Sequence, residues 1–345
     1  MTLDQAVALS LLDNLSRVDL TARLHASDPE LVERAAPLVG RARDLRERAA
    51  TRGIGVLAWN DPRMPPALLA IGDCPPVLWY RGHLECIDVP AVAIVGSRYA
   101  SRVSIDTATK LASDLAARGV TVVSGLARGV DSAAHRGALQ AGRTAAVLGS
   151  GVDRVYPPEH KSLADDIAAA GVVLSEYPPG TAPLPFHFPM RNRLISGLCR
   201  AVVVIEAGEK SGSLITASCA LEQGREVMAV PGTVLHGRNR GGHALIRDGA
   251  RIVECADDVL EELGLSRVSH GRGGVEADGD AAASGGESAT STDPIVRRMD
   301  RGSPYDLDAL CASSGLDAAR LLPRLADLEL QGLIRRIGGG RFMRS

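Results

Sequence analysis

Short apolar runs that alternate with helical patterns constrain this chain more than any other feature of its sequence. Between residues 91 and 263, seven runs of three to five residues are rich in Val, Ala, Leu and Ile. Strands that are buried on both faces of a parallel sheet have this continuous apolar pattern. The stretches between them, for example residues 103–118 and 213–223, carry apolar residues at helical spacing. The predicted strands are residues 92–95, 120–123, 145–148, 172–174, 201–205, 226–230 and 251–253.

This alternation predicts an α/β fold with a Rossmann-like, doubly wound parallel sheet over residues 91–263. Ligands of such sheets bind beyond the carboxyl ends of the strands, so the turns after the predicted strands are candidate sites. Four further segments are expected. They are a helical accessory domain of the SAM-like kind (1–53), a connector with short strands (54–90), a flexible linker rich in Gly, Ser and Ala (264–293), and a helix–helix–hairpin domain typical of a winged helix (294–345).

Composition limits the kinds of partner that the chain can bind. The 345 residues carry a net charge of −2, so any nucleic-acid site must be a local patch, and aromatic residues make up only 3%. The six cysteines form no C-x-x-C pair and are expected to be reduced. Neither a secretory signal peptide nor an apolar run long enough to span a bilayer is visible, which predicts a cytoplasmic protein without a membrane partner.

Three turns that follow predicted strands have the composition of anion-binding sites. Residues 96–98 are Gly-Ser-Arg, residues 124–128 are Ser-Gly-Leu-Ala-Arg, and residues 210–213 are Lys-Ser-Gly-Ser. Small residues at the start of a helix leave backbone N–H groups available to an anion, and the Arg or Lys adds positive charge. Because all three turns fall at the carboxyl ends of parallel strands, we interpret them as one phosphate-binding surface.

Each turn also has a structural alternative. The first lacks the G-x-G-x-x-G pattern and the third lacks the P-loop pattern, which disfavours an NAD-dependent enzyme and Mg-nucleotide hydrolysis. Either could be a tight turn with a solvated charge. In the helix after the second turn, we expect Asp131 to cap the N-terminus and His135 to pack in the core.

The stretch PLPFHFPMRNR at residues 183–193 brings aromatic and basic side chains together. Phe186 and Phe188 precede Arg191 and Arg193. This combination suits single-stranded nucleic acid, because bases stack on aromatic rings while cations hold the backbone. The alternative is that the two phenylalanines pack a long loop, and we expect one of them to belong to the core.

The remaining polar clusters indicate no catalytic site. Residues 236–243 (HGRNRGGH) contain two histidines and two arginines but no further metal ligands at suitable spacing, so we interpret them as a basic loop. No Ser/His/Asp set and no carboxylate pair stands out. We therefore expect a binding protein without a cofactor or a metal. The C-terminal domain has arginines that suit duplex DNA, and a protein-contact role is equally open.

Several sequence blocks, in their order and spacing, resemble the DNA-processing DprA (Smf) family. The blocks are VAIVGSR, SGLARGVDSAAHRGAL, VLGSGVDRVYPPEH, SEYPPG, FPMRNRLISGL, EAGEKSGSLITA and AVPG, and the resemblance covers about residues 75–260. It implies an extended Rossmann fold in a bacterial cytosolic protein. It also implies a homodimer that binds single-stranded DNA without sequence preference and loads the RecA recombinase in natural transformation or related recombination.

The resemblance and the turn chemistry together give a set of candidate DNA- and phosphate-binding residues. They are Gly96, Ser97, Arg98, Ser124, Gly125, Arg128, Phe188, Arg191, Asn192, Arg193, Lys210, Ser211, Gly212 and Ser213. The N-terminal region departs from the family, whose members often carry a Gly-Ile-Gly turn where this chain has Leu15-Ser-Arg-Val-Asp. A DNA-binding role is therefore not expected for residues 1–53.

A second hypothesis is a nucleotide-processing Rossmann enzyme similar to the phosphoribohydrolases of the lysine-decarboxylase-like group. Those enzymes carry a Pro-Gly-Gly-x-Gly-Thr turn near a catalytic Glu. This chain has Ala-Gly-Glu-Lys-Ser-Gly-Ser at residues 207–213 instead. Glu206 or Glu209 would have to take the catalytic role.

Overall fold

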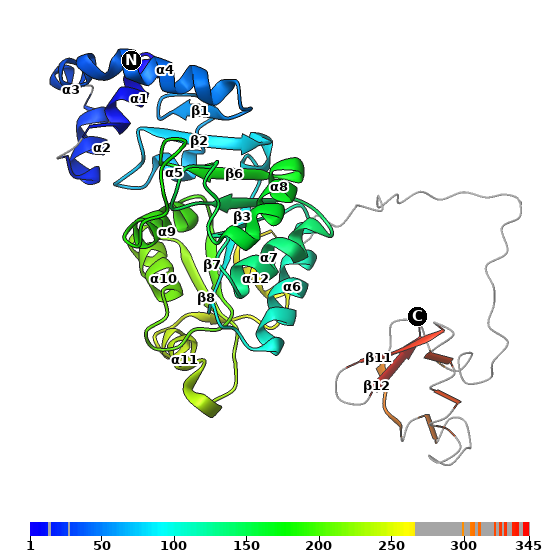
Figure 1. Ribbon diagram of the computed structural model, residues 1–345. Coiled ribbons are helices and arrows are strands. Elements are labelled where there is room, and N and C mark those ends of the chain that lie inside the picture. Colours follow the sequence, from blue (N-terminus) through cyan, green and yellow to red (C-terminus); the bar gives the residue numbers. More distant parts are fainter. Residues whose placement is uncertain are drawn as a thin grey trace, which may run out of the picture. The chain divides into compact units, whose positions relative to one another are not determined.

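The computed structural model describes residues 1–12, 15–26 and 28–265, and parts of residues 299–344. The described parts of that last segment are residues 299, 304–307, 310–311, 321, 324–325, 328–329, 333–337 and 341–344. The chain divides into two units, Met1–Gly271 and Arg272–Ser345 (Figure 1). None of the described helices has both the length and the apolar character that a membrane crossing requires.

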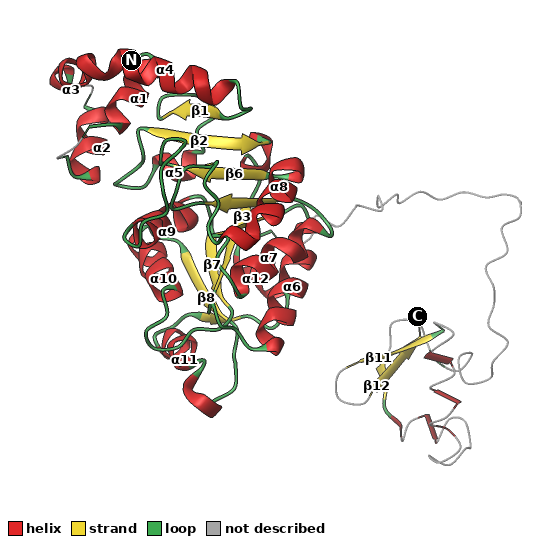
Figure 2. Ribbon diagram, in the orientation of Figure 1, coloured by secondary structure: helices red, strands yellow, loops and turns green. Residues whose placement is uncertain are grey.

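The first unit is built on one mostly parallel sheet (Figure 2). Its strands are β1 (Gly55–Ala58), β2 (Val77–Gly82), β3 (Ala91–Val95), β4 (Thr121–Ser124), β5 (Thr144–Val147), β6 (Val172–Ser175), β7 (Ala201–Val204), β8 (Glu226–Ala229) and β9 (Arg251–Ile252). Within residues 28–265 their order is β1-β2-β6-β5-β4-β3-β7-β8-β9. β3 to β9 pair in parallel, whereas β1 and β2 extend the sheet antiparallel beyond β6.

This arrangement confirms the predicted doubly wound sheet. Each of the seven predicted strands is observed, and each end agrees to within one residue. The central strands are buried along their whole length, because helices cover both faces. The strand order reverses between β3 and β7, which pair from Val92 with Ala201 to Val95 with Val204. Such a reversal opens a crevice beyond the carboxyl ends of the strands.

Helices cover both faces of the sheet (Figure 1). They are α1 (Leu3–Ser10), α2 (Arg17–His25), α3 (Pro29–Ala35), α4 (Val39–Ala50), α5 (Pro66–Leu69), α6 (Arg102–Ala116), α7 (Val130–Leu139), α8 (Lys161–Ala170), α9 (His187–Gly197), α10 (Ser213–Glu222), α11 (Arg240–Arg247) and α12 (Ala256–Glu262). α6, α7 and α12 pack on one face. α5, α9 and α10 pack on the other, where α11 joins them through Leu245.

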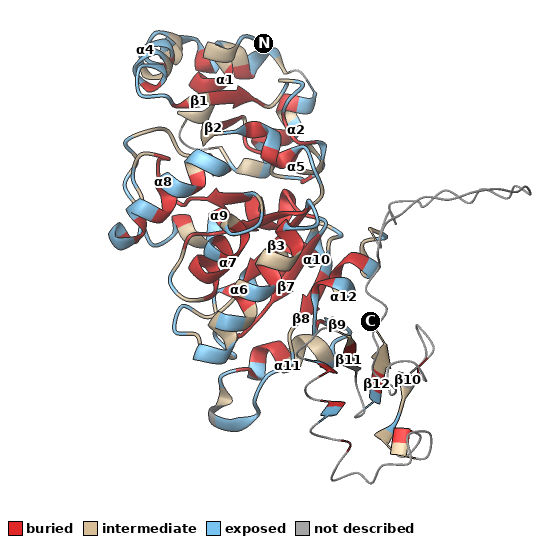
Figure 3. Cartoon of the chain, turned by 90° about the vertical axis from the view of Figure 1, so that its right-hand side faces the viewer, coloured by how far each residue is buried: buried red, intermediate tan, exposed pale blue. Residues whose placement is uncertain are grey.

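The N-terminal helices close the end of the sheet that β1 and β2 form. Buried side chains of α1, α3 and α4, among them Leu9 and Leu31, share one apolar cluster with Trp79 of β2 and Ile167 of α8. Figure 3 shows buried residues continuing from the sheet into these helices. The first unit is therefore continuous from α1 through α12.

The second unit contains a small sheet of its own. Its described strands β10 (Pro304–Tyr305), β11 (Ile334–Ile337) and β12 (Arg341–Arg344) lie in the order β10-β12-β11. β11 and β12 pair antiparallel, as the predicted hairpin requires. Leu310, Leu325 and Phe342 belong to its buried cluster. The sequence also predicts a helix cap at Asp317 and a glycine hairpin tip at residues 338–340. These residues and nearly all of the linker 264–293 lie outside the described residues.

Candidate functional site

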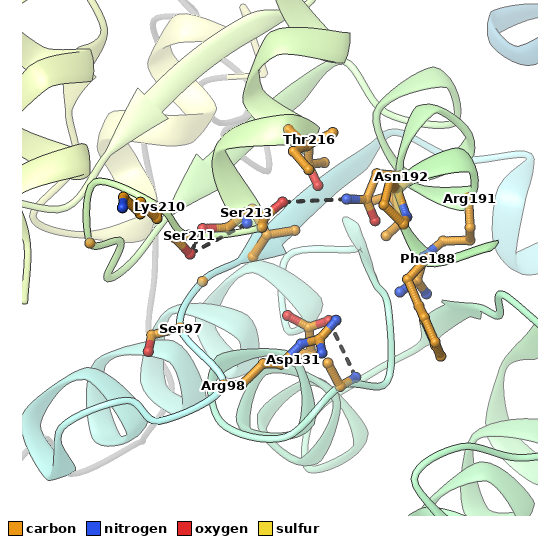
Figure 4. A pocket seen from close by; sticks show the side chains of 18 of the residues that line it. Ser97, Arg98, Asp131, Phe188, Arg191, Asn192, Lys210, Ser211, Ser213 and Thr216 are labelled. Atoms are coloured by element: carbon orange, nitrogen blue, oxygen red, sulfur yellow. Dashed lines mark hydrogen bonds between the residues drawn. The ribbon is translucent and has the colours of Figure 1, made fainter. Parts of the chain in front are cut away.

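A cavity of about 570 Å³ opens beyond the carboxyl ends of β3 and β7, where the strand order reverses. Its walls are the turn after β3, one face of α9, and the loop between β7 and α10 (Figure 4). Ten of the fourteen predicted residues line it. They are Gly96, Ser97, Arg98, Phe188, Arg191, Asn192, Lys210, Ser211, Gly212 and Ser213. All three predicted turns thus contribute to a single site, the second of them only through Ala127, together with α9.

The turn after β3 is packed so closely that only glycine fits at its first position. A Cβ at Gly96 would lie 2.6 Å from Cγ2 of Val130. The next N–H, of Ser97, donates to the carbonyl of Glu206 at 2.7 Å, which ties the turn to the end of β7. Arg98 then extends into solvent, with its guanidinium carbon 5.7 Å from the ring centre of Phe188. That distance allows a cation–π contact and leaves the N–H groups of Arg98 for a ligand.

The turn between β4 and α7 is closed by the protein's own charges. The carboxylate of Asp131 accepts hydrogen bonds from the N–H groups of Gly125 at 3.1 Å and Ala127 at 3.3 Å. The guanidinium of Arg191 donates to the carbonyls of Gly125, at 2.8 Å, and of Val147. Burial raises the pKa of Asp131 and lowers the pKa of Arg191 to about 10. Here an internal carboxylate occupies the place that we expected an anion to take.

The loop between β7 and α10 is open by contrast. Lys210 is exposed, and the described part of the chain offers it no ion-pair partner. The hydroxyls of Ser211 and Ser213 lie 2.7 Å apart at the start of α10, and Asn192 of α9 donates to the carbonyl of Gly212 at 3.4 Å. The loop therefore presents a free ammonium and two hydroxyls to the cavity, which is suitable chemistry for a phosphate.

Two predicted residues lie elsewhere and have other roles. Ser124 is fully buried, and its hydroxyl donates to the carbonyl of Ile94 at 2.7 Å, so it links β4 to β3. Arg193 is buried in an ion-pair cluster, 2.9 Å from Asp73 and 2.7 Å from Glu176. The sequence-based expectation that these two side chains contact DNA is wrong, because internal partners hold both of them.

A smaller recess of about 40 Å³ adjoins the main cavity on the side of α7. Gly125 and Arg128 line it, together with Arg98 and Phe188, which it shares with the main cavity. Tyr156 stands at its edge with its ring centre 5.4 Å from that of Phe188. The guanidinium of Arg128 is already paired, since its Nε donates to the Glu159 carboxylate at 2.6 Å.

Neither of the two phenylalanines of residues 183–193 is buried in the core. Phe186 is 63% exposed, and Phe188 is half-buried at the cavity wall. The expectation that one of them packs inside is wrong. His135, however, is buried as expected, with Nδ1 2.8 Å from the Thr144 hydroxyl, and burial lowers its pKa to about 3.

Sequence reasoning missed several residues that line the cavity. They include Tyr99, Ala127, Pro189, Ile195 and Thr216. Tyr99 is 82% exposed and directly follows the Gly-Ser-Arg turn, and this adjacency is the signal that could have found it. Ile195 lies four residues after Arg191 on α9, so helical periodicity predicts that both face the same way.

The carboxylates that a phosphoribohydrolase would need are engaged in structural contacts. Glu206 is buried and accepts hydrogen bonds from the N–H of Ser101 at 3.1 Å and the hydroxyl of Ser104 at 2.8 Å. It thus anchors Ser101, the N-cap residue of α6. Glu209 is exposed and lies 3.4 Å from Arg240, outside the lining of the main cavity. The geometry therefore gives the enzyme hypothesis no support.

Comparison with known proteins gives consistent matches over both units. Residues 55–264 match the family described as DNA recombination-mediator protein A, and residues 280–340 match the DprA winged helix domain. The chain is 48% identical to DNA processing protein DprA of Streptococcus pneumoniae over 59% of this chain and 72% of that relative. It is 37% identical to a putative DNA processing protein DprA of Mycobacterium tuberculosis over 89% of this chain and 82% of that relative.

Solved structures of DNA processing protein A also match this chain. The crystal structure of DNA processing protein A from Streptococcus pneumoniae matches with a TM-score of 0.61 at 38% identity, covering 75% of this chain and 93% of that chain. A structure of DNA processing protein A from Helicobacter pylori, described for its single-stranded DNA binding mode, matches with a TM-score of 0.56 at 30% identity. That match covers 61% of this chain and 95% of that chain.

Proposed function

The chain belongs to the DNA recombination-mediator protein A family, whose work is DNA processing in recombination, and from that premise we propose that it binds and protects single-stranded DNA. We further propose that it loads the RecA recombinase onto that DNA during DNA uptake, natural transformation or related recombination. The relative from Helicobacter pylori, with its described single-stranded DNA binding mode, supports the choice of ligand.

The observation that carries this proposal is the cavity at the strand reversal. Cationic side chains reach it from three separate elements: Arg98 from the turn after β3, Arg191 from α9, and Lys210 from the loop before α10. A single small anion needs fewer widely separated cations than this. A sugar–phosphate backbone that passes along the sheet edge presents successive phosphates to all three elements and uses each of them.

Each group in the cavity has a role that follows from its environment. Arg98 and Lys210 are exposed and can follow the backbone of a mobile strand. Arg191 is fixed by two carbonyls, so it contributes positive charge from a set position. Phe188 and Tyr99 offer ring faces on which bases can stack, which is a sequence-tolerant mode of binding worth about 1–3 kcal/mol per base.

The homodimer belongs to the same proposal. Val234 is 79% exposed and Leu235 is 63% exposed, just after β8 in the segment that leads to α11. Apolar side chains of this size on one surface are favourable contacts for a second copy of the chain. Light scattering on the full chain, compared with a Leu235→Asp variant, tests this assignment, because a monomeric wild-type chain would contradict it.

Fluorescence anisotropy on the full chain tests the proposed ligand. A labelled dT oligomer is expected to bind more tightly than a duplex of the same length, and its affinity is expected to fall steeply with salt. Equal or tighter binding to the duplex would contradict the proposal. RecA loading is tested separately, by whether the chain accelerates RecA-dependent strand exchange on single-stranded DNA that is already covered by a single-strand-binding protein.

A further inference from the structure

Helix α11 and the loop between β7 and α10 form a second groove next to the main cavity, and residues 240–243 of the expected basic loop belong to this helix. The groove has a volume of about 370 Å³ and is lined by Glu209, Leu214, Arg240, Gly241, Ala244 and Arg247. We call it the α11 groove. The function proposed above makes no use of these residues, although two of them are exposed arginines.

One wall of the α11 groove is a single face of a helix. Arg240, Ala244 and Arg247 are spaced i, i+4 and i+7 along α11, so their side chains lie on the same side. Seven residues of α-helix rise about 10 Å, which separates the two arginines along the wall. The small side chain of Ala244 between them leaves the groove open.

The position of this wall is fixed by close backbone packing. A Cβ at Gly241 would lie 2.7 Å from the carbonyl oxygen of Gly208, and the N–H of Gly241 donates to the carbonyl of Ala207 at 2.8 Å. The start of α11 therefore rests directly on the loop between β7 and α10. The groove is a built feature of the fold, with one wall from each of these two elements.

The loop between β7 and α10 separates the α11 groove from the main cavity. Lys210 and Ser211 line the main cavity, whereas their neighbours Glu209 and Leu214 line the groove. The segment before α11 also reaches the rim of the main cavity, because Arg238 donates to the carbonyl of Tyr99 at 2.9 Å. A strand that leaves the main cavity past Lys210 would enter the groove directly.

Charge in the α11 groove is only partly neutralised. Glu209 lies 3.4 Å from Arg240, and both side chains are about two-thirds exposed, at 65% and 66%. Exposed pairs of this kind are weak and are readily exchanged for another anion. Arg247 has no ion-pair partner among the described residues.

We propose that the α11 groove is a second contact site for single-stranded DNA, in which Arg240 and Arg247 bind phosphates of the strand that continues beyond Lys210. The inference rests on the proposed function and adds a second segment to its footprint. Glu209 competes with the DNA for Arg240 and thereby tunes the affinity of this segment.

The test compares two lengths of dT oligomer on the full chain. One oligomer of about 6 nucleotides fills the main cavity, and one of about 15 nucleotides also reaches the groove. The Arg240→Ala/Arg247→Ala variant is expected to bind the short oligomer like the wild type. The wild type is expected to bind the long oligomer more tightly than the short one, and the variant is expected to lose this difference. For the long oligomer, the slope of log affinity against log salt concentration is then less steep in the variant by roughly 1.4, or about 0.7 for each lost phosphate contact.

Two further variants make the result specific. Arg118→Ala/Arg136→Ala removes the same charge from the turn after α6 and from α7, on the opposite face of the sheet, and is expected to leave the binding of both oligomers unaffected. Glu209→Gln frees Arg240 and is expected to tighten binding of the long oligomer alone. Unchanged long-oligomer affinity and slope in the Arg240→Ala/Arg247→Ala variant would overturn the inference, as would an equal loss in the control. A wild-type chain that binds neither oligomer would instead overturn the proposed function itself.

Discussion

The turn between β4 and α7 and the loop between β7 and α10 have similar sequences but opposite structures. Both follow a buried parallel strand, both are rich in Gly and Ser, and both lead into a helix. In the first, Asp131 and Arg191 both bind the backbone of Gly125, Asp131 through its N–H and Arg191 through its carbonyl. In the second, Lys210 and the two hydroxyls of Ser211 and Ser213 remain open to the cavity.

The difference shows what decides whether a helix N-terminus binds an external anion. Free N–H groups at a turn attract whichever carboxylate or phosphate is within reach. The first turn of α7 supplies its own carboxylate at Asp131, whereas the first turn of α10 carries only Ser213, Leu214, Ile215 and Thr216. The closed turn stabilises the fold, and the open loop is the one left for DNA. The following predictions test this division.

Removing the internal anion from the closed turn is expected to have the largest effect. Asp131→Ala leaves the N–H groups of Gly125 and Ala127 without their acceptor and removes a negative charge that stabilises the buried guanidinium of Arg191, which costs about 3–5 kcal/mol of unfolding free energy. Chemical denaturation measures the loss. Asp106→Ala, which breaks an exposed pair with Arg102, is the matched control and is expected to change stability by less than about 0.5 kcal/mol. Equal losses in the two variants would show that the turn is not held by this carboxylate.

The buried histidine of the helix that follows the closed turn is expected to make the free energy of unfolding depend on pH. Burial lowers the pKa of His135 on α7 to about 3, from an ordinary value of 6.5. Between these values the unfolded chain binds a proton that the folded chain does not, so the stability present above pH 6.5 is lost as the pH falls towards 3. The loss from this group is about 1.4 kcal/mol per pH unit. Denaturation curves at several pH values are expected to show a shallower decline for His135→Gln, and an identical decline would contradict the assignment.

A glycine-to-alanine substitution is expected to affect stability differently in the closed turn and in the open loop. A Cβ at Gly125 would lie 2.6 Å from the guanidinium nitrogens of Arg191, whereas Gly212 has no atom within 4 Å of such a Cβ. Gly125→Ala is therefore expected to destabilise the chain by about 1–3 kcal/mol, as overpacking does. Gly212→Ala is expected to stay within about 0.5 kcal/mol of the wild type. Thermal unfolding of both variants gives the comparison, and a Gly125→Ala chain as stable as Gly212→Ala would show that the closed turn can relax.

Changes in the open loop are expected to affect binding and leave stability unchanged. Lys210→Ala removes an exposed cation, so the denaturation curve should match that of the wild type. Its affinity for a dT oligomer is expected to fall, with a log–log salt slope less steep by roughly 0.7. Lys210→Arg, which keeps the charge, is the control and is expected to retain the slope. An Ala variant with wild-type affinity and slope would remove this loop from the DNA site.

The buried elements could be predicted from the sequence because burial imposes a continuous apolar pattern. The seven strands of the parallel region follow from it. The position of the cavity also follows, since parallel strands with turns at their carboxyl ends determine where ligands bind. What could not be predicted is which polar groups of those turns would find partners inside the protein.

The two misassigned residues show the physical reason for that limit. Residues of an α-helix are about 100° apart around its axis, so Arg191 and Arg193 point in nearly opposite directions. Phe188, Arg191, Asn192 and Ile195 share the face that lines the cavity, while Arg193 turns inward to Asp73 and Glu176. The acidic partners of Arg193 lie far away in sequence, so composition around residues 183–193 gives no sign of them. Ser124 was misassigned for the same reason, because its acceptor belongs to the neighbouring strand.

The smallest effect on DNA affinity is expected from Arg128, which is exposed like the open loop but has an internal partner like the closed turn. Its guanidinium is exposed like Lys210, but it is already paired with Glu159, whose pKa is lowered by a backbone hydrogen bond and by this pairing. DNA must displace that carboxylate, so Arg128→Ala should weaken binding of a dT oligomer less than Lys210→Ala does. Glu159→Gln is the more informative variant, because it frees Arg128 and should tighten binding while steepening the salt slope. If Glu159→Gln leaves affinity and slope unchanged, Arg128 belongs with the closed turn as a structural residue, and the DNA path is confined to the side of the cavity formed by α9 and α10.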